Sequence, residues 1–153
     1  MTRAARLSDF TRRTVEYVLE SPDGDELVVT MRLLTRAETL AIEAKLPPRP
    51  EVPITRFEKD EDGHPQPIYD WQHPPYVQAI SERNERMTKQ YIADLWVLDE
   101  WDGKTDDERL ADLDAMPSWA QLGLAQAARM AVGLAGNAPR PFRTDRDASH
   151  EGV

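Results

Sequence analysis

The chain has 153 residues, enough for one domain of ordinary size with unpacked ends. Its 28 acidic and 19 basic side chains give a formal charge of −9, so phosphate backbones and anionic lipid would repel it. We therefore expect no nucleic-acid partner and no membrane partner. The absence of cysteine excludes disulfides, thiolate metal ligands and cysteine nucleophiles.

The first part of the chain predicts a basic arm, a hairpin and a short helix. Residues 1–13 hold four arginines and one aspartate, a charge of +3 with little apolar content, which predicts a flexible arm. Residues 14–34 predict a β-hairpin, because two β-rich runs flank the turn residues of 21–24. Thr35 and Glu38 stand at capping-box spacing and predict a helix over 36–46. The proline-rich and charged segment 47–74 predicts an irregular linker.

The second part of the chain predicts helices over residues 75–135. The longest, about 75–99, carries one apolar face at 3.6-residue spacing: Tyr76, Ile80, Asn84, Met87, Tyr91, Leu95 and Leu98. Thr105 and Glu108 predict the start of a short helix, and a last helix rich in small residues follows over 118–135. We expect a disordered tail over 136–153. The expected fold class is α+β, mostly helical: an N-terminal β-hairpin followed by three to four helices around a small core, in one domain over 14–135.

No residue pattern predicts catalysis, a cofactor or a metal, so we expect the chain not to be an enzyme. Residues 58–63 imitate the first half of an EF-hand loop, but the bidentate glutamate of position twelve is replaced by Tyr69. Eight acids lie between Asp99 and Asp114, which a solvated acidic face explains better than a metal site. A metal-dependent hydrolase that uses this 99–114 cluster stays open as an alternative. Among the tryptophans, Trp96 is expected in the core, whereas Trp71 and Trp101 fit a core or a partner surface equally well.

The order of elements carries a resemblance. A hairpin ends in Leu33-Leu34-Thr35-Arg36-Ala37-Glu38, a proline-rich gap follows, and Tyr69-Asp70-Trp71-Gln72-His73-Pro74-Pro75-Tyr76-Val77-Gln78-Ala79 leads into a long Arg/Glu-rich helix and a helical finish. This layout, with the pattern of Asp70, Pro74, Tyr76 and Ala79, resembles the tail assembly chaperones of long-tailed, siphovirus-type bacteriophages. The similarity covers about residues 14–135.

The resemblance implies a non-enzymatic chaperone of viral morphogenesis. Such a protein binds the tape-measure protein, keeps it soluble and promotes tail-tube assembly around it, in the host cytoplasm and not in the mature virion. It further implies contact with the tail-tube protein through a longer form made by ribosomal frameshifting, and it is compatible with self-association. A virion structural subunit, such as a neck or tail-terminator protein, is the nearest alternative.

A holder of long helical chains should offer an apolar groove with an acidic rim. We expect the groove to be formed by the long helix and the last helix, through Tyr76, Ile80, Met87, Tyr91, Leu122 and Met130. The expected acidic rim consists of Asp102, Asp106, Asp107 and Glu108. The alternative is that the six groove residues pack on one another as core.

Overall fold

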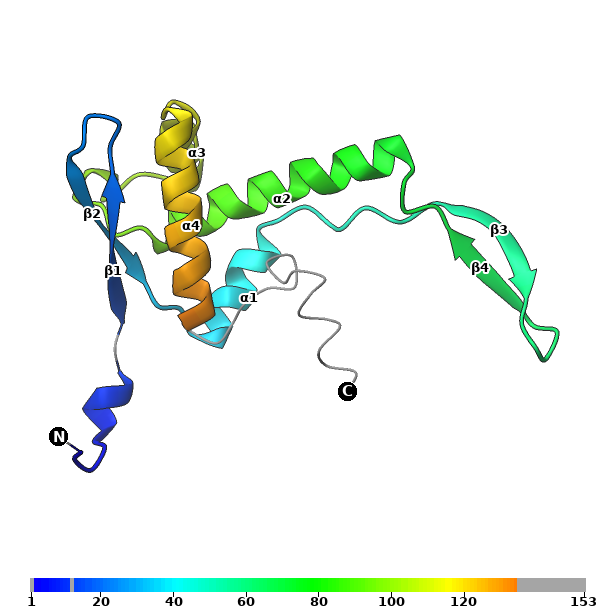
Figure 1. Cartoon of the computed structure of the whole chain (residues 1–153), viewed down its shortest axis with the longest axis horizontal. Helices are drawn as coiled ribbons and strands as arrows, with labels where there is room; N and C mark the ends of the chain where they lie inside the picture. The colour runs from blue at the N-terminus through cyan, green and yellow to red at the C-terminus, as the bar shows by residue number, and fades with distance from the viewer. Residues whose placement is uncertain (1, 12, 135–153) are drawn as a thin grey trace.

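A computed structural model of the chain describes residues 2–11 and 13–134 (Figure 1). A body at one end holds the first hairpin and three helices, packed around one end of the long helix α2 (Pro74–Leu95). The rest of α2 projects from this body, and a second hairpin lies beyond its tip. The fold is α+β and mostly helical, as the sequence predicts. The predicted tail over 136–153 lies outside the described residues.

The first hairpin confirms the prediction for residues 14–34. After a short 3-10 turn η1 (Leu7–Phe10), strands β1 (Thr14–Glu20) and β2 (Glu26–Arg32) pair antiparallel, with Val15 opposite Met31. The turn between them needs Gly24, whose φ of +86° suits a residue without a Cβ. Val15, Val29 and Met31 are buried, so alternate residues of the hairpin face the core.

Helix α1 (Arg36–Ala44) begins with the predicted capping box. The Glu38 amide donates to the Thr35 hydroxyl (3.3 Å), and the Thr35 amide donates to the Glu38 carboxylate (3.4 Å). These bonds satisfy two of the amide groups that a helix start leaves without partners. The hydrogen bond from the Thr35 amide N–H is the largest contribution that holds the pKa of Glu38 below its usual value, and the positive charge of Arg32 lowers this pKa further.

The prediction of an irregular linker over 47–74 is wrong for its central part. Strands β3 (Ile54–Lys59) and β4 (Pro65–Tyr69) form a second antiparallel hairpin, with Phe57 opposite Pro67 and Lys59 opposite Pro65. The two prolines are tolerated because they occupy alternate positions of a two-stranded sheet, where the missing N–H groups face away from the partner strand. The charge run that resembles an EF-hand is the turn of this hairpin, with Gly63 at a φ of +79°.

The long helix ends four residues earlier than the sequence predicts, at Leu95. Trp96 instead bridges to Met31 of β2, and the Val97 amide donates to the Thr30 carbonyl (2.9 Å). A 3-10 turn η2 (Asp99–Trp101) then leads to α3 (Asp106–Asp114) and α4 (Ser118–Leu134). Pairing with the sheet edge therefore replaces the last turn of the predicted helix.

One hydrophobic core lies between the first hairpin and the helices. The largest fully buried side chains come from four elements: Tyr91, Ile92 and Leu95 of α2, Met31 of β2, Trp101 of η2 and Leu113 of α3. Helix α4 adds the small residues Ala127, Ala128 and Ala131, which let it pack closely on its neighbours. Trp96 is partly buried against this core and Trp101 is buried within it, whereas Trp71 is exposed.

Candidate partner-binding surfaces

The predicted groove does not exist as a single surface. Met87 is only 3% exposed and Tyr91 is fully buried, so both belong to the core and neither lines an accessible groove. Burial, and secondarily the charge of Glu43, raises the pKa of Tyr91 to about 12. Tyr76 and Ile80 are half-buried on the projecting part of α2. Of the six predicted groove residues, only Met87 and Tyr91 therefore belong to the core, so the alternative that all six pack together as core is not met either.

The remaining two predicted residues, Leu122 and Met130, belong to an exposed apolar row on α4. The row follows one side of the helix at spacings of three, eight and four residues: Trp119, Leu122, Met130 and Leu134. Leu122 is 72% exposed, Leu134 is 64% exposed and Met130 is 50% exposed. We call these four residues the α4 outer row. The spacing of these four residues in the sequence is sufficient to place them on one side of a helix.

A groove runs beside the outer row, between α2 and α4. It has a volume of about 280 Å³ and is lined by apolar Ile92, Leu122 and Ala125, with Glu85 and Lys89 among its polar residues. Lys89 lies 3.2 Å from Glu85 and 2.6 Å from Asp114 of α3, and the hydrogen bond to Asp114 is the largest contribution that raises its pKa. The groove therefore combines apolar side chains with the ion pairs of Lys89. Such a lining is better suited to contact with an amphipathic helix than to binding of a small polar molecule.

The acids of the predicted rim have different roles in the structure. Asp106 lies 2.9 Å from Lys45, which also reaches Asp94 at 3.0 Å and so joins α1 to α2 and α3. Burial alone would lower the pKa of Lys45, but its hydrogen bonds to Asp106 and Asp94 outweigh that effect and raise it. Asp102, Asp107 and Glu108 are exposed.

Three of the eight acids between residues 99 and 114 pair with lysines: Asp106 with Lys45, Asp112 with Lys104 and Asp114 with Lys89. Lys104 lies 2.7 Å from Asp112, which also accepts a hydrogen bond from the Trp101 indole N–H (2.8 Å). The Lys104 bond, then the Trp101 bond, lowers the pKa of Asp112. Within residues 2–11 and 13–134, no three of the acids from 99 to 114 bring their oxygens close enough together to hold one ion. The geometry thus gives the hydrolase alternative no assembled site.

One group of potential metal ligands does converge, at the tip of the β3–β4 hairpin. Single ligand atoms of Asp60, Asp62 and His64 lie within 4.8 Å of one another. The Asp60 carboxylate, however, already accepts hydrogen bonds from the amides of Asp62 (2.9 Å) and His64 (2.8 Å) and from the Gln66 side chain (3.3 Å). The formation of a tight turn accounts for this arrangement.

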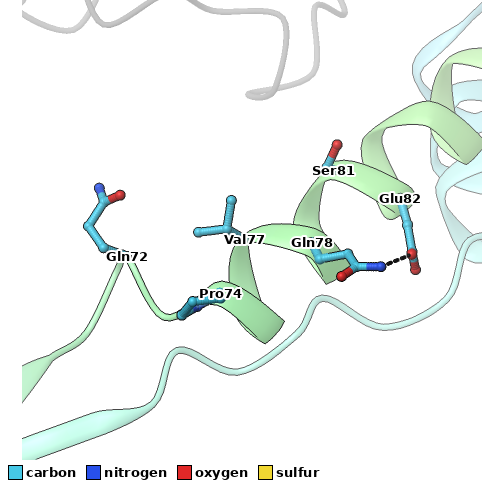
Figure 2. Close-up of a pocket in the computed structure, with 6 residues that line it drawn as sticks. All are labelled: Gln72, Pro74, Val77, Gln78, Ser81 and Glu82. Atoms are coloured by element: carbon cyan, nitrogen blue, oxygen red, sulfur yellow. Dashed lines mark hydrogen bonds between the residues drawn. The ribbon is translucent and has the colours of Figure 1, made fainter.

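The projecting end of α2 carries a shallow hollow of about 510 Å³ (Figure 2). Figure 2 shows Gln72 on the loop before the helix and Val77 and Ser81 along one side of the helix, while Gln78 donates a hydrogen bond to Glu82 (3.0 Å) further around it. The Glu82 carboxylate is the only ionisable group among the residues that line it. The hollow is therefore lined by one carboxylate and otherwise by uncharged side chains.

Comparisons with protein families, with curated proteins and with solved structures find no match for this chain. No helix in the described part of the chain is both long enough and apolar enough to cross a membrane.

Proposed function

We propose that this protein is a tail assembly chaperone of a long-tailed bacteriophage. It binds the tape-measure protein, keeps that long chain soluble and promotes assembly of the tail tube around it. The sequence layout supports this proposal, and so does a single structural observation, the α4 outer row. Helix α4 is apolar on its buried side, through Leu124, Ala128 and Val132, and again on its exposed side.

A helix that is apolar on two sides ordinarily has both sides covered. Here one side packs on α2 and the first hairpin, while the outer row has no cover within the described residues. A helical partner with its own apolar stripe would complete the packing, side by side with α4 and over the groove toward α2. Burial of a leucine or methionine side chain contributes about 1.5–3 kcal/mol, so the row can supply a useful affinity without covalent chemistry.

The net charge of −9 supports the proposed role of keeping the tape-measure protein soluble. A chaperone that coats an apolar chain must keep the assembly dissolved, and a strongly charged exterior opposes aggregation. The exposed carboxylates of Asp102, Asp107 and Glu108 contribute to this exterior.

Co-expression with the tape-measure protein of the same genome tests the proposal. The test variant is Leu122→Ser combined with Met130→Ser, and the matched control is Leu40→Ser, which removes a similarly exposed leucine (54%) from α1. We expect the tape-measure protein in the soluble fraction with the wild type and the control, and mostly in the pellet with the double variant. Each lost contact should weaken binding by about tenfold.

Two results would contradict the proposal at different points. If the double variant protects the tape-measure protein as well as the wild type does, the α4 outer row is not the binding surface. If the wild type gives no protection, the function itself is wrong. Mass spectrometry of purified particles separates the chaperone from a virion subunit, because only a subunit would be present.

A further inference from the structure

The β3–β4 hairpin carries most of its apolar side chains on one face. In its register Ile54 stands opposite Tyr69 and Phe57 stands opposite Pro67, and the irregularity between Ile54 and Arg56 brings both pairs to the same side. The intervening pairs, Arg56 with Ile68 and Glu58 with Gln66, face the other way. The pair of Lys59 with Pro65, nearest the turn, lies on the same side as Phe57 and adds one positive charge there. We call Ile54, Phe57, Pro67 and Tyr69, together with the adjoining Trp71, the hairpin apolar face.

No described segment of the chain covers this face. Phe57 is 64% exposed and Trp71 is 58% exposed, and the Trp71 ring contacts only the neighbouring rings of Tyr69 (6.0 Å) and Tyr76 (6.1 Å) among the described aromatic residues. An isolated two-stranded hairpin is marginally stable in water. Three aromatic side chains of roughly 150–250 Å² each, about half exposed, leave on the order of 300 Å² of apolar surface for a partner.

The charge around the face indicates what kind of partner fits. Residues 54–70 contain five acids and two bases, a net charge of −3. Two such hairpins stacked face to face would bring like charges together, so symmetric stacking is disfavoured. A segment that combines apolar side chains with positive charge is complementary instead.

The chain itself contains such a segment. Residues 1–13 carry a net charge of +3, in contrast to the −9 of the whole chain. Within this segment Arg3, Arg6 and Arg13 are exposed, and Leu7 is 82% exposed. Leu7 begins the 3-10 turn η1, and it takes no part in the core.

We propose that the hairpin apolar face of one copy binds residues 2–13 of a second copy of this chain. The two regions lie at opposite ends of the molecule (Figure 1). A contact within one copy would require the segment to run back along α2, whose 22 residues span about 33 Å. The contact between copies joins two different surfaces, so it is heterologous and leads to a ring or an open chain of subunits. The proposal rests on the hairpin and the basic segment, and it is independent of the tape-measure proposal.

Cysteine cross-linking tests the contact directly, because the natural chain has no cysteine and each variant carries a single thiol. Ser8→Cys marks the basic segment, Thr55→Cys marks the edge of the hairpin apolar face, and Val18→Cys is a control at an exposed position of the other hairpin. The full-length variants are mixed in pairs and oxidised. We expect a mixed disulfide dimer of Ser8→Cys with Thr55→Cys that is at least about fivefold more abundant than the dimer of Ser8→Cys with Val18→Cys. The yield of the first dimer should fall when the salt concentration rises from about 0.05 M to about 0.5 M, because salt screens the charges of the two surfaces.

A second substitution tests which face is used. In the Thr55→Cys background, Phe57→Ser should abolish the mixed dimer, while Gln66→Ser on the opposite face should leave it unchanged. Equal cross-linking of Ser8→Cys to both partners would overturn the proposal, as would a Phe57→Ser variant that cross-links normally while its circular dichroism matches the parent. A dominant dimer of Thr55→Cys with itself would show face-to-face stacking instead, and would also overturn it.

Discussion

Arg109 of α3 hydrogen-bonds to the C-terminal end of α2, and its replacement gives a quantitative test of the fold. The Ala93 carbonyl has no helical partner, because the Val97 amide that would reach it donates to Thr30 instead. Arg109 Nη1 donates to this carbonyl (3.2 Å), and Nη2 donates to the Trp101 carbonyl (3.1 Å). The guanidinium carbon also lies 5.9 Å from the centre of the Trp101 ring. One cation therefore joins α2, η2 and α3, at a helix end where positive charge is favourable.

The Arg109→Met substitution keeps the apolar stem and removes both hydrogen bonds. Hydrogen bonds from a charged donor contribute about 1.5–3 kcal/mol each, and the partial exposure of Arg109 favours the lower limit. We therefore expect the free energy of unfolding to fall by about 3 kcal/mol. Arg109→Lys keeps the charge but cannot reach both carbonyls at once, so it should cost about half as much.

Urea unfolding, followed in parallel by tryptophan fluorescence and by far-UV circular dichroism, measures both variants. With a slope of about 2 kcal/mol per M urea, the Arg109→Met midpoint should shift down by about 1.5 M. Coincident transitions from the two probes would justify a two-state treatment. A loss below about 1 kcal/mol for Arg109→Met would refute the assignment of Arg109 as the cap of α2, and so would a Lys variant less stable than the Met variant.

Three further predictions concern helix ends, pH and close packing. Thr35→Ala should lower the free energy of unfolding by about 1 kcal/mol. Because the pKa of Glu38 is lowered in the folded state, Glu38 should stabilise the fold near neutral pH, and this stability should be lost as the pH falls through the lowered pKa. Glu38→Gln should remove this pH dependence when thermal stability is measured in an acid titration. The pKa of Tyr91 is raised to about 12, so the folded state should lose stability as the pH rises from about 10 to about 12, and the tyrosinate absorbance of Tyr91 should appear only with unfolding. Gly123→Val should cost about 1–3 kcal/mol in urea unfolding, because even a Cβ at this position would lie 2.9 Å from Leu19 Cδ2, and a neutral result would show that α4 sits further from β1.

Local signals in the sequence were sufficient for the first hairpin, the capping box and the long helix. Each depends on residues close together in the chain: Gly24 in its turn, Thr35 with Glu38, and the apolar period of α2. The end of α2 could not be predicted in this way, because the competing partner of Val97 is Thr30, far away in the sequence.

The second hairpin had a signal that the prolines obscured. Both turns have glycine at the fourth of five positions, and its amide donates to the carbonyl of the first position: Gly24 to Ser21 (2.9 Å) and Gly63 to Asp60 (3.0 Å). In both turns the amide of the first position also donates to the carbonyl of the fifth. Prolines two residues apart, at Pro65 and Pro67, are compatible with one edge of a strand, whereas adjacent prolines are not. The matching turn pattern would have identified this hairpin.

The division of apolar residues between core and surface could not be predicted from periodicity alone. A stripe on α2 shows which residues share a face, but not whether α3 and α4 of the same chain cover that face. The structure buries Met87 and Tyr91 and leaves Leu122 and Met130 outside. The sequence predicted a partner surface at the interface between α2 and α4, whereas the exposed apolar residues lie on the outer side of α4.

Hydroxyl-radical footprinting of Met130 shows whether the α4 outer row binds the tape-measure protein. Met130 is 50% exposed, whereas Met31 is fully buried and Met87 is 3% exposed, so Met130 should oxidise far faster than the other two in the free protein. The experiment compares the free chain with a stoichiometric complex with the tape-measure protein. We expect strong protection of Met130, together with Leu122, in the complex. An isolated stable complex in which both residues are oxidised as fast as in the free chain would contradict it.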